Sequence, residues 1–231
     1  QVQSQLPAEN GTWAVFISDL VNGTEGSLND QKMQAASLIK LYIMGAVYEN
    51  YDQITGQYGR DSVDSNLYSM ITVSDNDAAN TLTTYLGGGD SAAGMQAVNS
   101  FCQAHGYDQT HMGRMLLASN ENDDNYTSVG DCGHLLQEIY KQDTSGYTHA
   151  ADMFNLLKAQ TRCNKSPAQL PEGVKTANKT GELDNVENDA GIIYDSKNDV
   201  VIVFMSQNLS SAGSAQNTIA TLSRTIYDYY N

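Results

Sequence analysis

The sequence predicts an α/β (α+β) fold in which an antiparallel β-sheet is flanked by helices and carries an inserted all-helical lobe. A strand-like stretch and a helix come first, a mostly helical region runs from about residue 50 to 165, and strand-like stretches with a final helix follow. Such an order is typical of one α/β unit interrupted by a helical block. We therefore expect a single domain over 1–231, with an α/β lobe of 1–48 plus 166–231 and a helical lobe of 49–165.

The first elements follow from local composition. Residues 12–20, TWAVFISDL, alternate aromatic and β-branched side chains between turn-rich flanks, which indicates a strand. The next segment, 21–30, is rich in Gly, Asn and Asp and reads as a turn region. From about Ala36 a helix follows, and it has no clearly polar side, which is typical of a helix buried on most faces.

The helical block and the later strands differ in their period. Apolar residues recur at spacings of three and four in four segments, 66–86, 91–106, 127–142 and 150–162. After Pro167 and Pro171 the period becomes two, which predicts strands over 174–183, 189–197 and 199–207. The last two strands form a hairpin through the turn DSKND, and a helix over 214–231 closes the chain.

Composition excludes several classes of protein. With 27 acidic and 12 basic residues the net charge is −15, which argues against sequence-independent binding to nucleic acid or to anionic lipid. No apolar run approaches the roughly 18 residues of a membrane span. The opening QVQSQLPAENGTW has neither the charged nor the apolar region of a signal peptide, so we expect no membrane insertion of this chain and expect any signal segment to have been removed.

Cysteine and histidine spacings give no metal site. The three cysteines, Cys102, Cys132 and Cys163, and the four histidines fit no zinc pattern, so we expect neither a metal nor another cofactor. Cys102 and Cys132 lie in helix-like segments. They can form a disulfide in an oxidising compartment or remain buried free thiols, and the sequence leaves both states open.

Lys40 is the one charged residue between Met33 and Tyr48. We expect it to be buried, and a buried ammonium must find partners or lose its proton because desolvation lowers the pKa of a lysine. It therefore serves either as part of an ion pair or as a base. Ser37 lies one helical turn before it, where it is either a helix N-cap or a group that Lys40 can reach.

Two further motifs give this pair more weight. Ser74-Asp75-Asn76 lies between helical segments, where an Asx turn with a helix cap is the ordinary interpretation, and Lys179-Thr180-Gly181 lies on a predicted strand. With Ser37-Leu38-Ile39-Lys40, these motifs occur in the order S-x-x-K, S-D-N and K-T-G. The chain thus resembles the class A β-lactamase and penicillin-binding protein superfamily over nearly its whole length, which implies a β-lactamase/transpeptidase-like fold.

The residues and the resemblance together define a candidate acyl-transfer site. Ser37 is the expected nucleophile and Lys40 its base, with a pKa lowered further if Lys179 lies close. Ser74 can relay a proton to the leaving group, and Asn76 can donate its side-chain amide to a substrate carbonyl.

The other candidate residues bind rather than react. Lys179 and Thr180, followed by Gly181, are suited to hold a substrate carboxylate. The resemblance implies an oxyanion hole formed by the backbone N–H groups of Ser37 and Glu182.

The chain also departs from the family pattern. Class A enzymes carry a Glu-x-x-Leu-Asn stretch whose glutamate activates the deacylating water, but none follows Arg114, which resembles the arginine that opens this loop. The nearby acids Glu121, Asp123 and Asp124 are out of register, so the resemblance assigns this role to no residue. Where many class A enzymes have a carboxylate-binding arginine the chain has Ala190, and Glu182 is larger and more acidic than the usual residue. Both changes suggest a substrate other than a typical penicillin.

We therefore expect a serine hydrolase or acyltransferase that forms an acyl-enzyme on Ser37 with a β-lactam or a D-alanyl-D-alanine-type peptide. Two alternatives remain open: a functional β-lactamase with a different deacylating group, and a β-lactam sensor that is acylated without turnover. The resemblance further implies a small-molecule or peptidoglycan stem-peptide partner, a monomer, and a location outside the cytoplasmic membrane, in the cell envelope or secreted.

Overall fold

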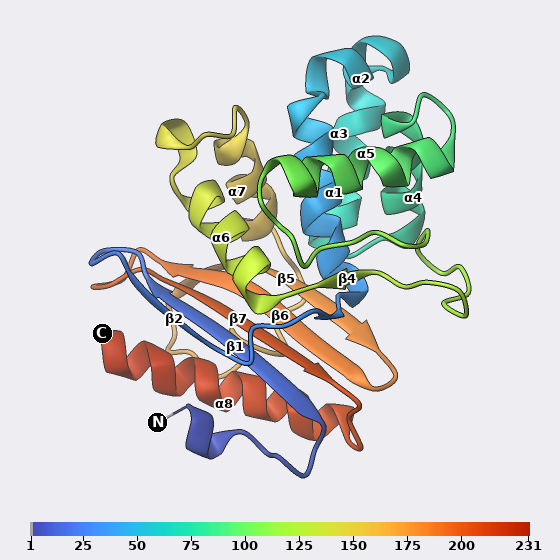
Figure 1. Ribbon diagram of the computed structural model, residues 1–231. Coiled ribbons are helices and arrows are strands. Elements are labelled where there is room, and N and C mark those ends of the chain that lie inside the picture. Colours follow the sequence, from blue (N-terminus) through green and yellow to red (C-terminus); the bar gives the residue numbers. More distant parts are fainter. Residues whose placement is uncertain (1) are drawn as a thin grey trace.

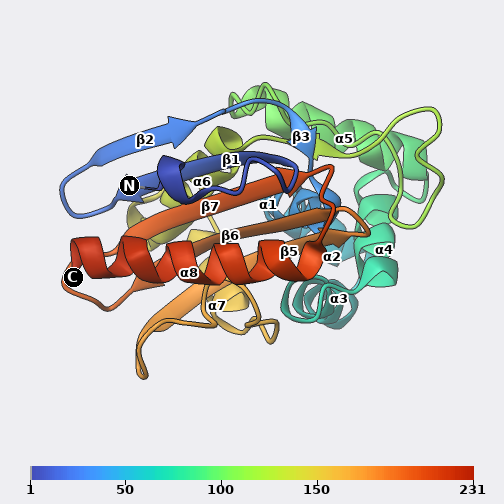
Figure 2. The ribbon, with the colours of Figure 1, turned by 90° about the horizontal axis from the view of Figure 1, so that it is seen from below.

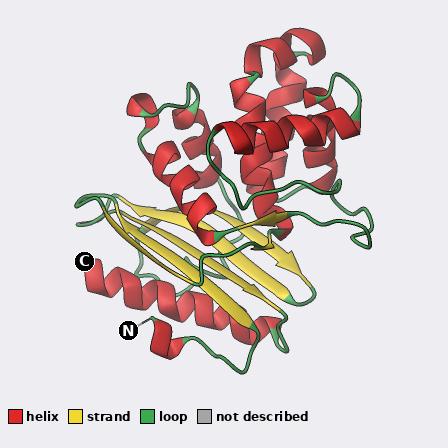
Figure 3. Ribbon diagram, in the orientation of Figure 1, coloured by secondary structure: helices red, strands yellow, loops and turns green. Residues whose placement is uncertain are grey.

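A five-stranded antiparallel sheet forms the centre of the molecule (Figures 1 and 3). The computed structural model describes residues 2–231. The strands lie in the order β2-β1-β7-β6-β5, so β2 and β5 are the edges. This confirms the predicted fold class. The strand bounds are β1 Thr12–Asp19, β2 Thr24–Leu28, β5 Lys175–Leu183, β6 Val186–Tyr194 and β7 Val200–Gln207.

Helices cover both faces of the sheet. The C-terminal helix α8, Ala212–Tyr230, runs across one face, and helices α1 to α7 lie on the opposite side (Figures 1 and 2). There α6 and α7 lie close to the sheet, while α2 to α5 are grouped around the upper part of α1 (Figure 1). The bounds are α1 Ile39–Glu49, α2 Tyr51–Tyr58, α3 Arg60–Thr72, α4 Asn76–Leu86, α5 Ser91–Ala104, α6 Val129–Tyr140 and α7 Ala150–Lys158, with short 3-10 turns η1 Gln3–Gln5, η2 Ala36–Leu38 and η3 Gln142–Thr144.

Strand β7 contributes side chains to two hydrophobic cores, one on each face of the sheet. Its side chains alternate in direction because successive residues of a strand face opposite sides. Val201, Val203 and Met205 pack in the large core under α1 and α6. Ile202 and Phe204 pack in the smaller core against α8. Because both faces of this strand are buried, its sequence is a continuous apolar run, VVIVFM, and not an alternation of apolar and polar residues.

Helix α1 is buried along its length, as its apolar sequence predicts. Every residue from Ile39 to Tyr48 is buried, Lys40 included. Gly45 allows a neighbouring helix to approach closely: a Cβ atom added there would lie 2.4 Å from the ring of Phe101 on α5. The helix that carries Lys40 is thus fixed between the sheet and the helical block.

Two strand predictions need correction. Residues 21–30 are more than a turn, because they contain the edge strand β2, whose mostly exposed sequence TEGSL gives no apolar alternation. Strand β6 begins at Val186, three residues before the predicted start at 189. Its first polar residues, Glu187 to Asp189, are buried, so their polarity hid the strand. A second small sheet, β3 Met33–Gln34 with β4 Tyr126–Thr127, was not predicted.

Cys102 and Cys132 are buried free thiols, so of the two states left open by the sequence the structure has the reduced one. Burial raises the pKa of Cys132 to about 12. Within residues 2–231 no three His, Cys, Asp or Glu side chains come together in a way that could hold a metal ion. Nor does any helix in that range have the length and apolar character to span a membrane.

Candidate active site

Ser37 stands in the 3-10 turn η2, directly before α1. Its side chain caps neither helix, so the N-cap interpretation is wrong. Instead its Oγ lies 3.1 Å from Lys40 Nζ, one turn further along. Ser37 is partly exposed whereas Lys40 is fully buried. The pair therefore joins a reachable hydroxyl to an amine shielded from water.

Lys40 is surrounded by uncharged oxygen atoms. Its Nζ lies 2.6 Å from the backbone oxygen of Ser74 and 2.7 Å from Asn76 Oδ1, neither of which can donate a proton. It also lies 3.1 Å from Ser74 Oγ. A neutral amine has two N–H groups and one lone pair. A neutral Lys40 can use both N–H groups in the two short contacts and keep its lone pair for the hydroxyl of Ser37, 3.1 Å away.

The electrostatics favour this neutral amine. Burial, and then the positive charge of Arg162, lowers the pKa of Lys40 from its usual value to about 7, while Asp75 acts in the opposite direction. Asp75 itself caps α4, since its carboxylate accepts the N–H of Ala78 at 2.8 Å. The Asx-cap interpretation of this motif is thus correct and compatible with a site beside it.

Lys179, on strand β5 of the sheet, contacts Ser74. Its Nζ donates to Ser74 Oγ at 2.9 Å and to the backbone oxygen of Thr180 at 2.8 Å. Burial lowers the pKa of Lys179 well below its usual value, and the charges of Lys40, Arg162 and Lys165 lower it further. Ser74 Oγ therefore lies between two amines, and the structure brings together Ser37, Lys40, Ser74 and Lys179.

The backbone at the site is tightly constrained. Ala36 and Ser74 have φ values of +47° and +62°, a region that side chains other than glycine rarely adopt. A Cβ atom on Gly181 would lie 2.9 Å from the Ala35 oxygen and 3.3 Å from the Ser37 nitrogen. Strand β5 is an edge strand, so alternate backbone N–H groups are not used by the sheet, and η2 packs against this strand. The oxyanion hole at Ser37 and Glu182 stays a prediction.

A pocket of about 300 Å³ opens at Ser37. The loop between α5 and α6 forms one side of it and the end of β5 the other. Asn76 lines it with its amide oxygen turned to Lys40, so the amide nitrogen lies on the other side of the planar group. The lining residues are Ala36, Ser37, Asn76, Arg114, Leu116, Leu117, Ala118, Ser119, Asn120, Asn125, Glu182 and Leu183.

Two cations lie beside Glu182 that were not predicted from the sequence. Its carboxylate lies 3.3 Å from Arg162 Nη1 and 3.2 Å from Lys165 Nζ. Lys165 is buried and also lies 2.6 Å from Glu187. Ala190 stands beside Lys179 on β6, where the sequence has no arginine, and Arg162 brings a guanidinium to Glu182 from the segment before β5. In the sequence, the one indication of their role is that Arg162 and Lys165 shortly precede the strand with the Lys179-Thr180-Gly181 motif.

The three acidic residues considered as bases for deacylation either have other partners or are exposed. Asp124 is held by Arg114 Nε at 2.6 Å and by Gln34 Nε2 at 3.0 Å. Asp123 pairs with His111 at 2.7 Å, and Glu121 is exposed. Among the described residues that line the pocket, the acidic one is Glu182, whose carboxylate is paired with two cations.

Lys179 and Thr180 are both buried, with exposed fractions of 0% and 1%. Their assignment to a substrate carboxylate stays a prediction. Arg162, with 45% of its side chain exposed, is the more accessible cation beside this strand.

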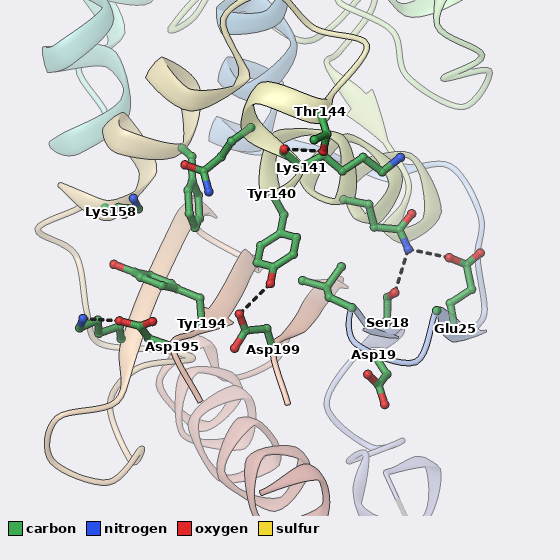
Figure 4. Close-up of a pocket in the computed structure, with 16 residues that line it drawn as sticks. Ser18, Asp19, Glu25, Tyr140, Lys141, Thr144, Lys158, Tyr194, Asp195 and Asp199 are labelled. Atoms are coloured by element: carbon green, nitrogen blue, oxygen red, sulfur yellow. Dashed lines mark hydrogen bonds and ion pairs between the residues drawn. The ribbon is translucent and has the colours of Figure 1, made fainter. Parts of the chain in front are cut away.

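A larger hollow of about 950 Å³ borders the other end of β5 (Figure 4). Its polar side chains bind each other: Tyr140 donates to Asp199 at 2.8 Å, and Lys175 pairs with Asp195. Lys175 begins β5, whereas the Lys179-Thr180-Gly181 motif lies in its second half. This hollow is therefore separate from the serine.

The fold, with a serine in the turn before α1 and a buried lysine in the first turn of that helix, is that of the class A β-lactamases and related penicillin-binding proteins. The chain belongs to the beta-lactamase enzyme family, whose model matches residues 1–58 and 57–230. This confirms the resemblance seen in the three motifs.

Solved structures agree with this assignment. A beta-lactamase from Sphaerobacter thermophilus DSM 20745 is 21% identical, with a TM-score of 0.83 over 99% of this chain and 95% of that one. PBP-A is 22% identical, with a TM-score of 0.85 over 99% and 93%. An ancestral (GNCA) class A beta-lactamase is 21% identical, with a TM-score of 0.84 over 100% of both chains. At these identities the likeness concerns the fold. Among curated proteins none matches the chain.

Proposed function

We propose that this protein is an active-site serine acyltransferase or hydrolase that forms an acyl-enzyme on Ser37 with a β-lactam or a D-alanyl-D-alanine-type peptide. The observation that carries the proposal is the environment of Lys40. Two short contacts to non-donating oxygens and a pKa of about 7 leave a lone pair beside Ser37 Oγ. A serine hydroxyl needs such a base to become a nucleophile.

The acylation step follows from these contacts. Ser37 Oγ attacks the carbonyl carbon, its proton moves to Lys40 Nζ, and the oxyanion accepts the N–H groups of Ser37 and Glu182. The carbon–nitrogen bond then breaks. The leaving nitrogen takes the proton of Ser74 Oγ, and Ser74 regains a proton from Lys40, 3.1 Å away. Lys40 ends neutral, so no proton is gained or lost overall.

Substrate class is the finer part of the proposal. A variant of PBP-A is described as an acyl-enzyme complex with penicillin G, which supports a β-lactam as one acyl donor here. Arg162, whose side chain is 45% exposed, supplies a positive charge near the end of β5 for the carboxylate that β-lactams and stem peptides share. By family analogy we place the protein outside the cytoplasmic membrane as a monomer.

Deacylation is the step for which the pocket offers least. The single acidic lining residue, Glu182, is held by Arg162 and Lys165. A positioned base commonly accelerates attack by water about 10²–10⁴-fold. We therefore propose a long-lived adduct with β-lactams rather than rapid turnover.

Intact-protein mass spectrometry after mixing with excess benzylpenicillin tests this function. We expect an increase by the mass of the drug that persists for minutes after free drug is removed, that is absent in Ser37→Ala and that remains in Ser27→Ala, an exposed serine on β2. Lys40→Ala should slow adduct formation about 10²–10⁴-fold because the hydroxyl loses its base.

Other results would redirect the assignment. Rapid hydrolysis of benzylpenicillin without a detectable adduct would identify a β-lactamase with an unrecognised deacylating group. An adduct that survives Ser37→Ala would show that another residue is acylated.

A further inference from the structure

Glu182 places a carboxylate of the chain itself in the pocket beside Ser37. It directly follows the Lys179-Thr180-Gly181 motif on β5, and its side chain, 33% exposed, lines the same pocket as the serine. β-Lactams and D-alanyl-D-alanine-type peptides both carry a carboxylate a few bonds from the carbonyl that is attacked. A negative charge of the protein therefore stands where these substrates bring one of their own.

Neighbouring charges hold the Glu182 carboxylate in place. Glu187 on β6 stands directly opposite it, and like charges in such a cross-strand pair repel each other. Lys165 bridges the two, with its Nζ 3.2 Å from Glu182 and 2.6 Å from Glu187. This lysine is fully buried and also donates to the backbone oxygens of Gly181 and Asn188. Lys165 therefore fixes Glu182 but offers no charge to a ligand.

Arg162 is the cation of this group that a ligand can reach, and Glu182 already contacts it. Arg162 Nη1 lies 3.3 Å from Glu182 Oε2, and 45% of the arginine side chain is exposed. With Lys165 and Glu187, these residues form a group of two cations and two anions, whose net charge is zero. A substrate carboxylate that approaches Arg162 would add an unbalanced negative charge beside Glu182, whereas an uncharged group would meet no such repulsion.

We propose that Glu182 is a specificity-determining residue that disfavours acyl donors with a carboxylate a few bonds from the attacked carbonyl. The preferred donors are uncharged at this position, as in an ester or an amidated peptide. A carboxylate binds Arg162 only in competition with Glu182. The inference rests on the proposed acylation of Ser37 and adds the charge of the substrate that the site accepts best.

The test compares benzylpenicillin with its methyl ester, which has the same reactive ring and side chain but no carboxylate charge. The second-order acylation rate constant is measured for both with the wild type and with Glu182→Gln, which removes the charge and keeps the backbone N–H. At about pH 9, above the pKa of about 7 of Lys40, a change in the protonation of this lysine contributes little. Glu138→Gln on α6 is the matched control, since this glutamate is 32% exposed and also paired with a cation, Lys141.

We expect Glu182→Gln to raise the ratio of the rate constant for benzylpenicillin to that for the methyl ester about five- to tenfold, because two like charges about 4 Å apart repel to this extent even in water. Glu182→Ala, which also keeps the backbone N–H, should raise this ratio similarly, and Glu138→Gln should leave it unchanged. A ratio that stays the same or falls in both Glu182 variants overturns the inference while acylation stands. If neither compound acylates the wild type, the proposed function fails and the inference with it.

Discussion

At the scale of single residues, the chemistry of the site depends on one proton at Lys40. Its amine contacts four uncharged oxygens, so no carboxylate among these contacts compensates a positive charge. Arg162 is the first charge that lowers its pKa after burial itself. Arg162 in turn is paired with Glu182. The fraction of neutral base therefore depends first on burial and then on a residue outside the three motifs.

The rate of acylation should follow the neutral fraction of Lys40. Its pKa is about 7, so below that value the amine is protonated and cannot accept the serine proton, and above it the rate should reach a plateau. We expect a rising profile between about pH 5 and pH 9 for the acylation rate constant with benzylpenicillin. A flat profile in this range would contradict the role of Lys40 as the base.

Arg162→Ala should move this profile. Removal of the cation takes away a term that lowers the pKa of Lys40, and it leaves the Glu182 carboxylate less neutralised, so both effects raise that pKa and shift the midpoint to higher pH. Arg224→Ala is the control, since Arg224 is a comparably exposed arginine paired with Asp228 on α8. A midpoint that stays in place would show that Arg162 does not tune the base.

Sequence motifs located the reacting residues but not those that tune them. Ser37, Lys40, Ser74 and Lys179 were predictable because residue type and spacing carry their chemistry. Arg162 was not, since it belongs to no motif. Its position beside Glu182 depends on how the segment before β5 is folded, and one sequence does not reveal such long-range placement.

At the scale of elements, the site depends on how closely the edge strand β5 approaches η2. Gly181 permits this approach because a Cβ atom there would meet the backbone of Ala35 and Ser37. Strand β5 itself was visible in the sequence through its period of two. The exposed strand β2 and the polar start of β6 were not visible in the sequence. The alternation of apolar and polar residues depends on which side chains are buried, and not on the strand conformation itself.

Gly181→Ala should therefore impair acylation more than stability. The added methyl group would push β5 away from η2 and separate the two oxyanion donors, and loss of one such donor typically costs about 10²–10³-fold in rate. Gly26→Ala on β2 is the control, because a Cβ atom there meets nothing within 4 Å. The acylation rate constant and the thermal midpoint of both variants are measured. Equal acylation by Gly181→Ala and the wild type would argue against the hole at this position.

At the scale of the whole molecule, the surface is strongly acidic. Three of the 12 basic side chains, Lys40, Lys165 and Lys179, are buried, and so are five of the 27 acidic ones, which leaves 22 acidic and 9 basic side chains that are not buried. Burial and neighbouring cations lower the pKa values of Lys40 and Lys179 inside the molecule. On the exterior, the excess of carboxylates makes the surface charges repel one another.

This imbalance predicts that salt stabilises the fold. Net repulsion among surface carboxylates opposes the compact state, and it is screened when the Debye length falls from about 20 Å to about 4 Å, as between roughly 0.02 M and 0.5 M sodium chloride. The exposed ion pairs weaken over the same range, but such pairs contribute only about 0–1 kcal/mol each. We expect the thermal midpoint at neutral pH to rise by a few degrees, about 2–4 °C for each kcal/mol gained. Differential scanning calorimetry measures this shift. A midpoint that falls with salt would show that the ion pairs, rather than the net charge of −15, dominate the electrostatic free energy of unfolding.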